Sequence, residues 1–248
     1  MRRFAFIAAL VFAPLATANA SGADWLSQTG RAPNSVAADA ARKPVEVLTF
    51  LGIKAGDVAL DYGAGGGYYS DIMAAAVGES GKVVAWDGGQ FKGGEALAAR
   101  WRDITGRHAN VSRLIQPIDG FEAPAASYDF ALLHLVYHDL YWQSEAEKMP
   151  RRDPDQFVKA LFVAMKPGGI VGVVDHAGPA GDTRALVDQL HRIDPAVVRA
   201  DFLRAGFVLE GESDILHVEG DDYTKDVFQP ETRAKSDRFI LKFRKPAS

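Results

Sequence analysis

The chain contains no cysteine among its 248 residues. This absence excludes disulfide bonds, thiolate catalysis, cysteine-ligated zinc and cysteine-held iron–sulfur clusters. Basic residues are also in the minority, with 28 Lys and Arg against 32 Asp and Glu, and the formal net charge is −4. We therefore do not expect a nucleic-acid partner, because such proteins neutralise phosphates with an excess of basic side chains.

Long apolar runs are also missing after the N-terminal segment, so no span of a membrane is expected once that segment is removed. Residues 1–20 have the layout of a secretory signal peptide. Two arginines at positions 2–3 precede an unbroken apolar run over residues 4–12, and Ala-Asn-Ala at positions 18–20 has the small-x-small pattern of a signal-peptidase site. This pattern predicts cleavage after Ala20 and export, with the periplasm as the expected location.

Strand-like apolar runs alternate with helix-like segments along the rest of the chain, a pattern typical of βαβ units around a parallel sheet. We predict an N-terminal helical cover over residues 21–56 and one α/β domain over residues 57–248. The expected strands cover residues 58–61, 82–86, 111–116, 128–134, 170–175, 207–210 and 238–243. Two long connections, 137–152 and 211–237, are candidates for functional loops.

A glycine-rich loop, D-Y-G-A-G-G-G at residues 61–67, follows the first predicted strand. Glycines at such a place allow a sharp turn and the close approach of a ligand. The dinucleotide fingerprint G-x-G-x-x-G requires a sixth-position glycine, and counting from Gly63 that position is Tyr68. An NAD(P)-dependent oxidoreductase is therefore disfavoured.

An acid followed by glycines two, four and six residues later fits the loop instead: Asp61, Gly63, Gly65 and Gly67. This arrangement resembles the first motif of the class I S-adenosylmethionine (SAM) methyltransferases. The resemblance implies that these four residues hold the methionine end of SAM. After SAM gives up its methyl group, the product that leaves is S-adenosylhomocysteine. A carboxylate at this position would attract the ammonium group of SAM, whereas it would repel a pyrophosphate.

Two further acids extend the resemblance along the cofactor. Asp87 ends the second predicted strand, and the resemblance assigns it to the ribose hydroxyl groups of SAM. For the position that meets the adenine, Asp119 is the candidate, although Gln116 is an alternative. A simple turn aspartate before Gly120 explains Asp119 equally well.

The resemblance covers almost the whole chain after residue 20, including the strand at 128–132 and the turn at 165–169. It implies a three-layer, doubly wound α/β fold with a seven-stranded, mostly parallel sheet and an antiparallel last strand. The segments 137–140 and 191–194 are similar to those of a group of predicted exported bacterial methyltransferases.

Catalytic candidates follow the fourth and fifth predicted strands, because ligands of doubly wound sheets bind outside the carboxyl ends of the strands. His138 is the first candidate for a general base, with Asp139 orienting it or contacting substrate, and His176 is the second. Structural hydrogen bonding explains each histidine equally well. Tyr223, Phe228 and Arg233 of the last long loop are expected over the same rim.

A divalent metal is a minority hypothesis, and no residue is assigned as a metal ligand. Some small-molecule O-methyltransferases carry an Asp-Asn pair after the fifth strand, whereas this chain has Asp175-His176. The sequence therefore predicts SAM-dependent methyl transfer to oxygen or nitrogen of a small molecule. The alternative is a periplasmic protein that binds SAM or a nucleotide without turnover.

Overall fold

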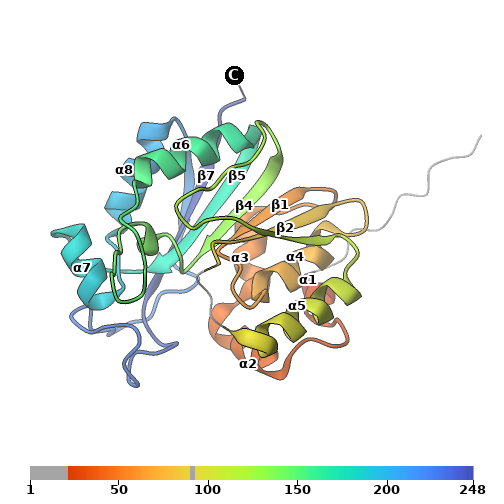
Figure 1. Ribbon diagram of the computed structural model, residues 1–248, viewed down its shortest axis with the longest axis horizontal. Helices are drawn as coiled ribbons and strands as arrows, with labels where there is room; N and C mark the ends of the chain where they lie inside the picture. The colour runs from red at the N-terminus through yellow and green to blue at the C-terminus, as the bar shows by residue number, and fades with distance from the viewer. Residues whose placement is uncertain (1–21, 90–92, 248) are drawn as a thin grey trace, which may run out of the picture.

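The computed structural model describes residues 22–89 and 93–247, so the predicted signal peptide at residues 1–20 lies outside the described part of the chain. The described residues form one seven-stranded sheet with the order β3-β2-β1-β4-β5-β7-β6 (Figure 1). Only β7 is antiparallel to its neighbours among these strands. The strands are β1 (Val58–Tyr62), β2 (Lys82–Asp87), β3 (Val111–Ile115), β4 (Tyr128–His134), β5 (Met165–His176), β6 (Val208–Ser213) and β7 (Arg238–Arg244). The predicted fold class is confirmed.

Helices cover both faces of this sheet. The helices are α1 (Gly22–Leu26), α2 (Pro33–Arg42), α3 (Pro44–Leu51), α4 (Tyr68–Val77), α5 (Gly94–Arg107), the short 3-10 helix η1 (His138–Leu140), α6 (Pro154–Ala164), α7 (Thr183–Leu190) and α8 (Pro195–Ala205). Helices α1, α3, α4 and α5 pack on one face, and α6 and α8 pack on the other. The helices of residues 22–51 therefore share a core with the sheet.

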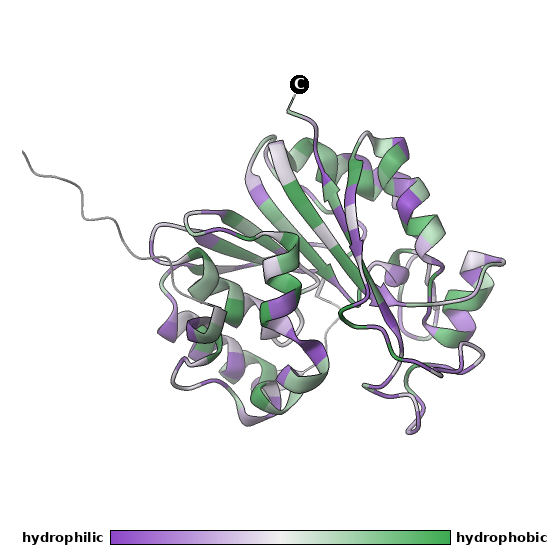
Figure 2. Cartoon of the chain, turned by 180° about the vertical axis from the view of Figure 1, so that it is seen from behind, coloured by the Kyte–Doolittle hydropathy of each residue, from purple (hydrophilic) through white to green (hydrophobic). Residues whose placement is uncertain are grey.

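The core is divided by the alternation of side chains along the strands. In β4, Phe130 and Leu132 belong to the core under α3 and α4, whereas Ala131 and Leu133 belong to the core under α6 and α8. All four are almost completely buried, as expected for a central parallel strand covered on both faces. Figure 2 shows the hydrophobic residues concentrated in these central strands.

Aspartates cap the starts of two helices. Asp153 caps α6 by accepting hydrogen bonds from the backbone N–H groups of Asp155 and Gln156. Asp194 caps α8 through the N–H of Ala196. In both helices proline follows the cap, where its missing N–H costs no hydrogen bond.

Two local predictions are wrong. The turn expected at residues 165–169 lies inside β5, which begins at Met165 rather than at Ile170, and the register shifts between Tyr128 and Phe130. A φ of +79° at Gly168 lets the strand pass through this irregularity, a conformation that glycine adopts readily. Helix α7 was not expected, because its apolar residues form only a narrow stripe over two turns.

The topology brings three loops to one edge of the sheet. Because β1, β4 and β5 are parallel, the loops that follow them leave from the same edge. Strand β7 runs the opposite way, so its first residue, Arg238, pairs with the last residue of β5, His176. The loop of residues 214–237 therefore arrives at this same edge (Figure 1).

Candidate active site

The glycine loop after β1 needs glycine at its first position for two reasons. Gly63 has a φ of +72°, a region that residues with a side chain rarely adopt. A Cβ atom there would lie 2.8 Å from Cγ1 of Val136, in the segment after β4. Gly65 and Gly67 also have positive φ values, of +51° and +73°. The backbone of the loop is thus pressed against the end of β4.

A cavity of about 320 Å³ opens beside this loop, and we call it the glycine-loop cavity. Of the four residues predicted to hold the methionine end of SAM, Asp61, Gly63 and Gly65 line this cavity, whereas Gly67 does not. Their role in holding a ligand stays a prediction. The opposite wall comes from α2, through Asn34 and Ser35. Its size is at the lower end of the range for small-molecule sites.

Asp61 is a buried carboxylate in the glycine-loop cavity. The hydroxyl of Ser70 donates a hydrogen bond of 2.5 Å to its Oδ2. Burial nevertheless raises the pKa of Asp61 to about 6, because the charged form loses hydration. Ionised Asp61 therefore destabilises the protein at neutral pH unless a cation binds beside it.

Replacing Asp61 with asparagine is expected to raise the free energy of unfolding by about 1–3 kcal/mol at pH 8. The folded-state pKa lies above the unfolded value, so the stability present below about pH 4 is lost as the pH rises through 6. Urea unfolding at pH 8 and pH 4 measures the difference, which should shrink to about 0.5 kcal/mol at pH 4. An equal difference at both pH values would contradict the assigned cause.

Several buried polar atoms that line the glycine-loop cavity have no hydrogen-bond partner in the described structure. They are Nε2 of His134, Oη of Tyr69 and Nε of Arg100. The rings of Tyr69 and His134 lie 4.6 Å apart between centroids. Burial lowers the pKa of His134 well below its ordinary value, so this imidazole is neutral. Unpaired buried polar groups are costly, and their gathering here indicates a place for a polar ligand.

The other predicted cofactor residues lie apart from this cavity. Asp87 is fully buried at the end of β2, where it accepts hydrogen bonds from the side chain of Arg113 and from the backbone N–H of Gly89. Asp119 lines a different cavity, of about 370 Å³, together with Tyr62 and Arg152. The ribose and adenine assignments stay predictions.

Gln116, the alternative to Asp119, is engaged within the protein. Its Oε1 accepts a hydrogen bond of 2.7 Å from Nε1 of Trp86, and its side-chain amide also bonds the backbone of Glu122. These bonds give Gln116 a structural role at the end of β3.

A further cavity, of about 310 Å³, lies over the ends of β4 and β5, and we call it the arginine cavity. Three arginines line it: Arg42 of α2, Arg233 of the loop 214–237 and Arg238 of β7. His176 and Phe228 line it as well, so the structure brings Phe228 and Arg233 to the predicted rim. Tyr223 instead donates a hydrogen bond to the carboxylate of Asp237.

The glycine-loop cavity and the arginine cavity meet at the end of β4. Ala38, Arg42 and Leu135 line both of them. Leu135 has a φ of +58°, which is strained for a leucine, and its N–H donates a hydrogen bond to the carbonyl of Val174. Strained residues of this kind cluster at functional sites.

His138 forms a buried pair with Asp175. Its backbone N–H and its Nδ1 contact the two carboxylate oxygens of Asp175 at 2.8 and 2.7 Å. Burial by itself would lower the pKa of His138, but the charges of Asp175 and Asp139 outweigh it and raise the pKa to about 9. The imidazole therefore carries its proton at pH 7.

The catalytic roles predicted for His138 and Asp139 stay predictions. Nε2 of His138 lies 3.3 Å from a carboxylate oxygen of Asp139. Neither His138 nor Asp139 belongs to the described residues that line the glycine-loop cavity or the arginine cavity. A protonated His138 cannot accept a second proton, so it would act on the reaction by holding the loop after β4 in place.

His176 lies directly on the arginine cavity, next to the His138 pair. Its Nδ1 lies 2.7 Å from the hydroxyl of Ser236. Burial lowers the pKa of His176 to about 3, although the charge of Asp175 opposes the change. A neutral imidazole on the wall of a cavity can accept a hydrogen bond from a bound hydroxyl or amine.

The sequence did not point to Arg42, Arg100 or Arg238 as site residues. They come from three elements that are far apart along the chain, and only the folded arrangement shows that their guanidinium groups line the two cavities. Arg238 also opens a predicted strand, where a single basic residue gives no functional signal.

Within residues 22–89 and 93–247 no group of three or more His, Asp or Glu side chains is arranged to hold a metal ion. In the same part of the chain no helix has the length and apolar character needed to cross a bilayer.

Comparisons with known proteins extend the resemblance seen in the sequence. Residues 33–90 match the sequence model of the protein-L-isoaspartate(D-aspartate) O-methyltransferase family. The chain is similar to a demethylmenaquinone methyltransferase of Lactobacillus johnsonii, with 27% identity over 129 residues. That alignment covers 52% of this chain and 48% of the Lactobacillus protein, so the chain spans about half the length of this relative.

Solved structures share the fold at low sequence identity. A SAM-dependent methyltransferase from Aquifex aeolicus has a TM-score of 0.57 at 20% identity, over 82% of this chain and 89% of that chain. The [4+2]-cyclase SpnF has a TM-score of 0.57 at 20% identity, over 90% and 86%. The 1,6-didemethyltoxoflavin-N1-methyltransferase of Burkholderia thailandensis, solved with 1,6-didemethyltoxoflavin and S-adenosylhomocysteine, has a TM-score of 0.54 at 15% identity, over 84% and 78%. The chain therefore has the fold of the class I SAM-dependent methyltransferases.

Proposed function

We propose that this chain transfers the methyl group of SAM to an oxygen or nitrogen atom of a small molecule. One observation carries the proposal: the glycine-loop cavity and the arginine cavity meet at Ala38, Arg42 and Leu135, at the carboxyl ends of β1, β4 and β5. Methyl transfer needs two ligands side by side, and two adjacent cavities with a shared wall would hold one ligand each.

The residues of the glycine-loop cavity fit the methionine end of SAM, which is a zwitterion. Asp61 would hold the ammonium group, and a bound cation would relieve the cost of burying this carboxylate. Arg100 would hold the carboxylate group, because its Nε has no partner and its other nitrogens are fixed by Asn34 and Ser35. The absence of a Cβ at Gly63 lets the loop pack against Val136 beside the cavity.

For the ribose, Asp87 remains the proposed contact. Its carboxylate already accepts a hydrogen bond from Arg113, so binding of the ribose hydroxyl groups would require that side chain to move. Arg113 is partly exposed, so it has room to do so. Asp119 remains the proposed adenine contact from the neighbouring cavity.

SAM supplies an electrophilic methyl group on a sulfonium when it is bound. The chain would contribute mainly by positioning, which can provide about 7–11 kcal/mol of a barrier when two reactants are held in line. His176, neutral and on the wall of the arginine cavity, would accept the hydrogen bond of the acceptor hydroxyl or amine. His134 would do the same from the end of β4.

The names of two similar proteins support a small acceptor. One is a demethylmenaquinone methyltransferase and another is a 1,6-didemethyltoxoflavin-N1-methyltransferase. Both cavities here are also of the size that suits small molecules.

Titration calorimetry with SAM and with S-adenosylhomocysteine tests the cofactor. We expect both to bind, and we expect Arg100→Met to weaken binding by about tenfold or more because a charge-assisted hydrogen bond is lost. Arg102→Met is the matched control, since Arg102 lies in the same helix but is exposed and pairs with Glu95.

Failure of both ligands to bind would remove the proposed function together with the SAM-binding form of its non-catalytic alternative. Binding without turnover of labelled SAM against a panel of acceptors would favour the alternative, a SAM-binding protein that performs no methyl transfer.

We also propose that the protein is exported to the periplasm. The support is the arrangement of residues 1–20, with its arginines, apolar run and Ala-Asn-Ala site. A chain without cysteine suits an oxidising compartment, because it has no thiol to oxidise.

A further inference from the structure

Arg238 is a buried arginine without a carboxylate partner. It is 7% exposed, and among the described residues it forms no ion pair. One guanidinium nitrogen donates a hydrogen bond of 2.9 Å to the carbonyl of Ala41, and its Nε has no partner. Buried charges in proteins are normally paired, so a missing partner indicates that an anion binds there.

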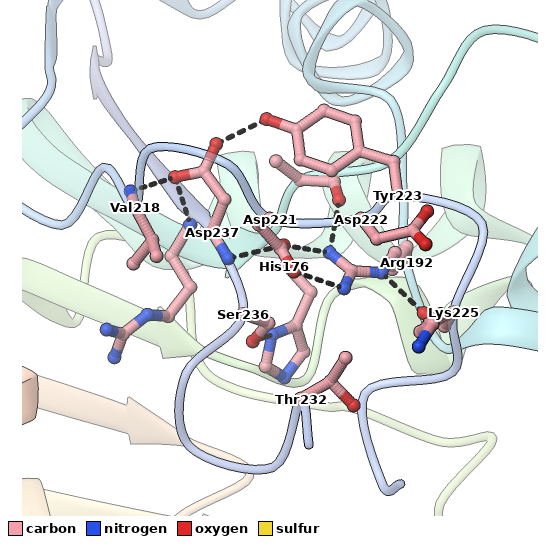
Figure 3. Close-up of polar contacts among 12 residues, drawn as sticks. His176, Arg192, Val218, Asp221, Asp222, Tyr223, Lys225, Thr232, Ser236 and Asp237 are labelled. Atoms are coloured by element: carbon pink, nitrogen blue, oxygen red, sulfur yellow. Dashed lines mark hydrogen bonds and ion pairs between the residues drawn. The ribbon is translucent and has the colours of Figure 1, made fainter.

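The nearest acids are already used within the protein. The carboxylate of Asp237 accepts hydrogen bonds from Tyr223 and from the backbone N–H of Val218 (Figure 3). It also contacts Nδ1 of His217. Asp221 is paired with Arg192 through both of its oxygens, at 2.7 and 3.1 Å. These bonds hold the loop 214–237 in place and leave neither carboxylate available to Arg238.

Two more arginines share the cavity with Arg238. Arg42 lies over the ring of Tyr68, 4.3 Å from its centroid, and Arg233 is exposed on the loop 214–237. Neither Arg42 nor Arg233 forms an ion pair within the described residues. No Asp or Glu among the described residues lines the arginine cavity. The charged side chains that line the cavity are therefore all positive.

Apart from His176 and Ser236, the rest of the cavity wall is apolar. It is formed by alanines of α2 together with Leu135, Val227 and Phe228. Phe228 is 55% exposed and places an aromatic ring at the wall of the cavity. A ligand of this cavity thus needs an anionic group for the arginines and an apolar body for the remaining wall.

We infer that the methyl acceptor is a small organic carboxylate with an apolar body, bound by Arg238, Arg42 and Arg233 in the arginine cavity. The role of this carboxylate as methyl acceptor rests on the proposed function, but the binding of an anion in the arginine cavity does not depend on it. An anion beside Arg238 would also oppose the positive charges that act on His176, which makes that imidazole a better hydrogen-bond acceptor.

Calorimetry with two matched pairs of probes tests the inference: benzoate against benzamide, and hexanoate against hexanamide. We expect each carboxylate to bind the full protein at least about tenfold more tightly than its neutral amide. Equal binding of acid and amide, or no binding of either carboxylate, would overturn the inference.

Variants locate the binding. Arg238→Gln keeps a donor for the carbonyl of Ala41 but removes the charge, and it should weaken benzoate binding by about tenfold or more. Arg233→Ala is on the surface and should fold normally, and it should weaken binding by a few fold. Lys235→Ala is the matched control, because Lys235 lies in the same loop but does not line the cavity.

Unchanged benzoate affinity in both arginine variants would contradict the assigned residues. Titration of S-adenosylhomocysteine into the same samples separates the two proposals. If S-adenosylhomocysteine binds and the carboxylates do not, the inference fails and the proposed function stands. If the carboxylates bind and S-adenosylhomocysteine does not, the proposed function fails and the anion site stands.

Discussion

Replacing Asp175 with alanine is expected to lower the free energy of unfolding by about 3–5 kcal/mol, which corresponds to a fall in Tm of about 6–20 °C. The carboxylate is fully buried and accepts hydrogen bonds from the backbone N–H groups of His138 and His176, and it also contacts Nδ1 of His138. Alanine would leave these donors without a partner and would leave the charge of His138 buried and uncompensated.

The dependence of this loss on pH identifies the ion pair. The folded-state pKa of His138, about 9, lies above the unfolded value of about 6.5. The stability from the pair is therefore fully present below pH 6.5 and is lost as the pH rises through 9. Urea unfolding should show the largest difference between wild type and Asp175→Ala near pH 6, and a smaller one at pH 9.5.

Asp175→Asn is the control for shape. Asparagine keeps one carbonyl oxygen for the backbone N–H of His138 but carries no charge, so its loss should be smaller than that of alanine at each pH. Because both variants lose the ion pair, both losses should shrink between pH 6 and pH 9.5. A loss below about 1 kcal/mol for Asp175→Ala at pH 6 would show that the pair does not hold the loop after β4.

Replacing Gly63 with alanine should lower the free energy of unfolding by about 2–5 kcal/mol. The positive φ of +72° costs about 1–2 kcal/mol with a side chain present, and a Cβ at 2.8 Å from Val136 adds an overpacking cost of about 1–3 kcal/mol. Val136 is β-branched and stiff, so it cannot turn away. The added methyl group would also push the loop out of place, so SAM affinity should fall, which calorimetry measures.

Two further variants separate the causes. Gly66→Ala should change stability by less than about 1 kcal/mol, because Gly66 does not have a positive φ and a Cβ there meets Arg100 at an ordinary 3.5 Å. Adding Val136→Ala to Gly63→Ala should recover part of the loss by removing the clash, while the strain of the positive φ remains. A Gly63→Ala protein as stable as Gly66→Ala would contradict both assigned costs.

Secondary structure was largely predictable from the sequence because local chemistry controls it. The caps at Asp153 and Asp194 and the starts of most strands follow from residues next to one another. Where β5 begins was not predictable, since the passage of the strand through Gly168 depends on pairing with β4. Helix α7 was missed because its short amphipathic pattern does not stand out from a loop.

The absence of cysteine was enough to exclude thiol chemistry, and Asp61 with the glycines up to Gly67 was enough to predict the class I methyltransferase fold. That motif is readable because a sharp turn and a close ligand approach require glycine at fixed local positions. The preference of the arginine cavity for an anionic ligand could not be predicted from the sequence, because it depends on which carboxylates pair with which arginines. Arg192 pairs with Asp221 of the loop 214–237, and residues of the same loop hold Asp237, so Arg238 is left without a partner. These pairings depend on the path of the loop and exist only in the folded chain.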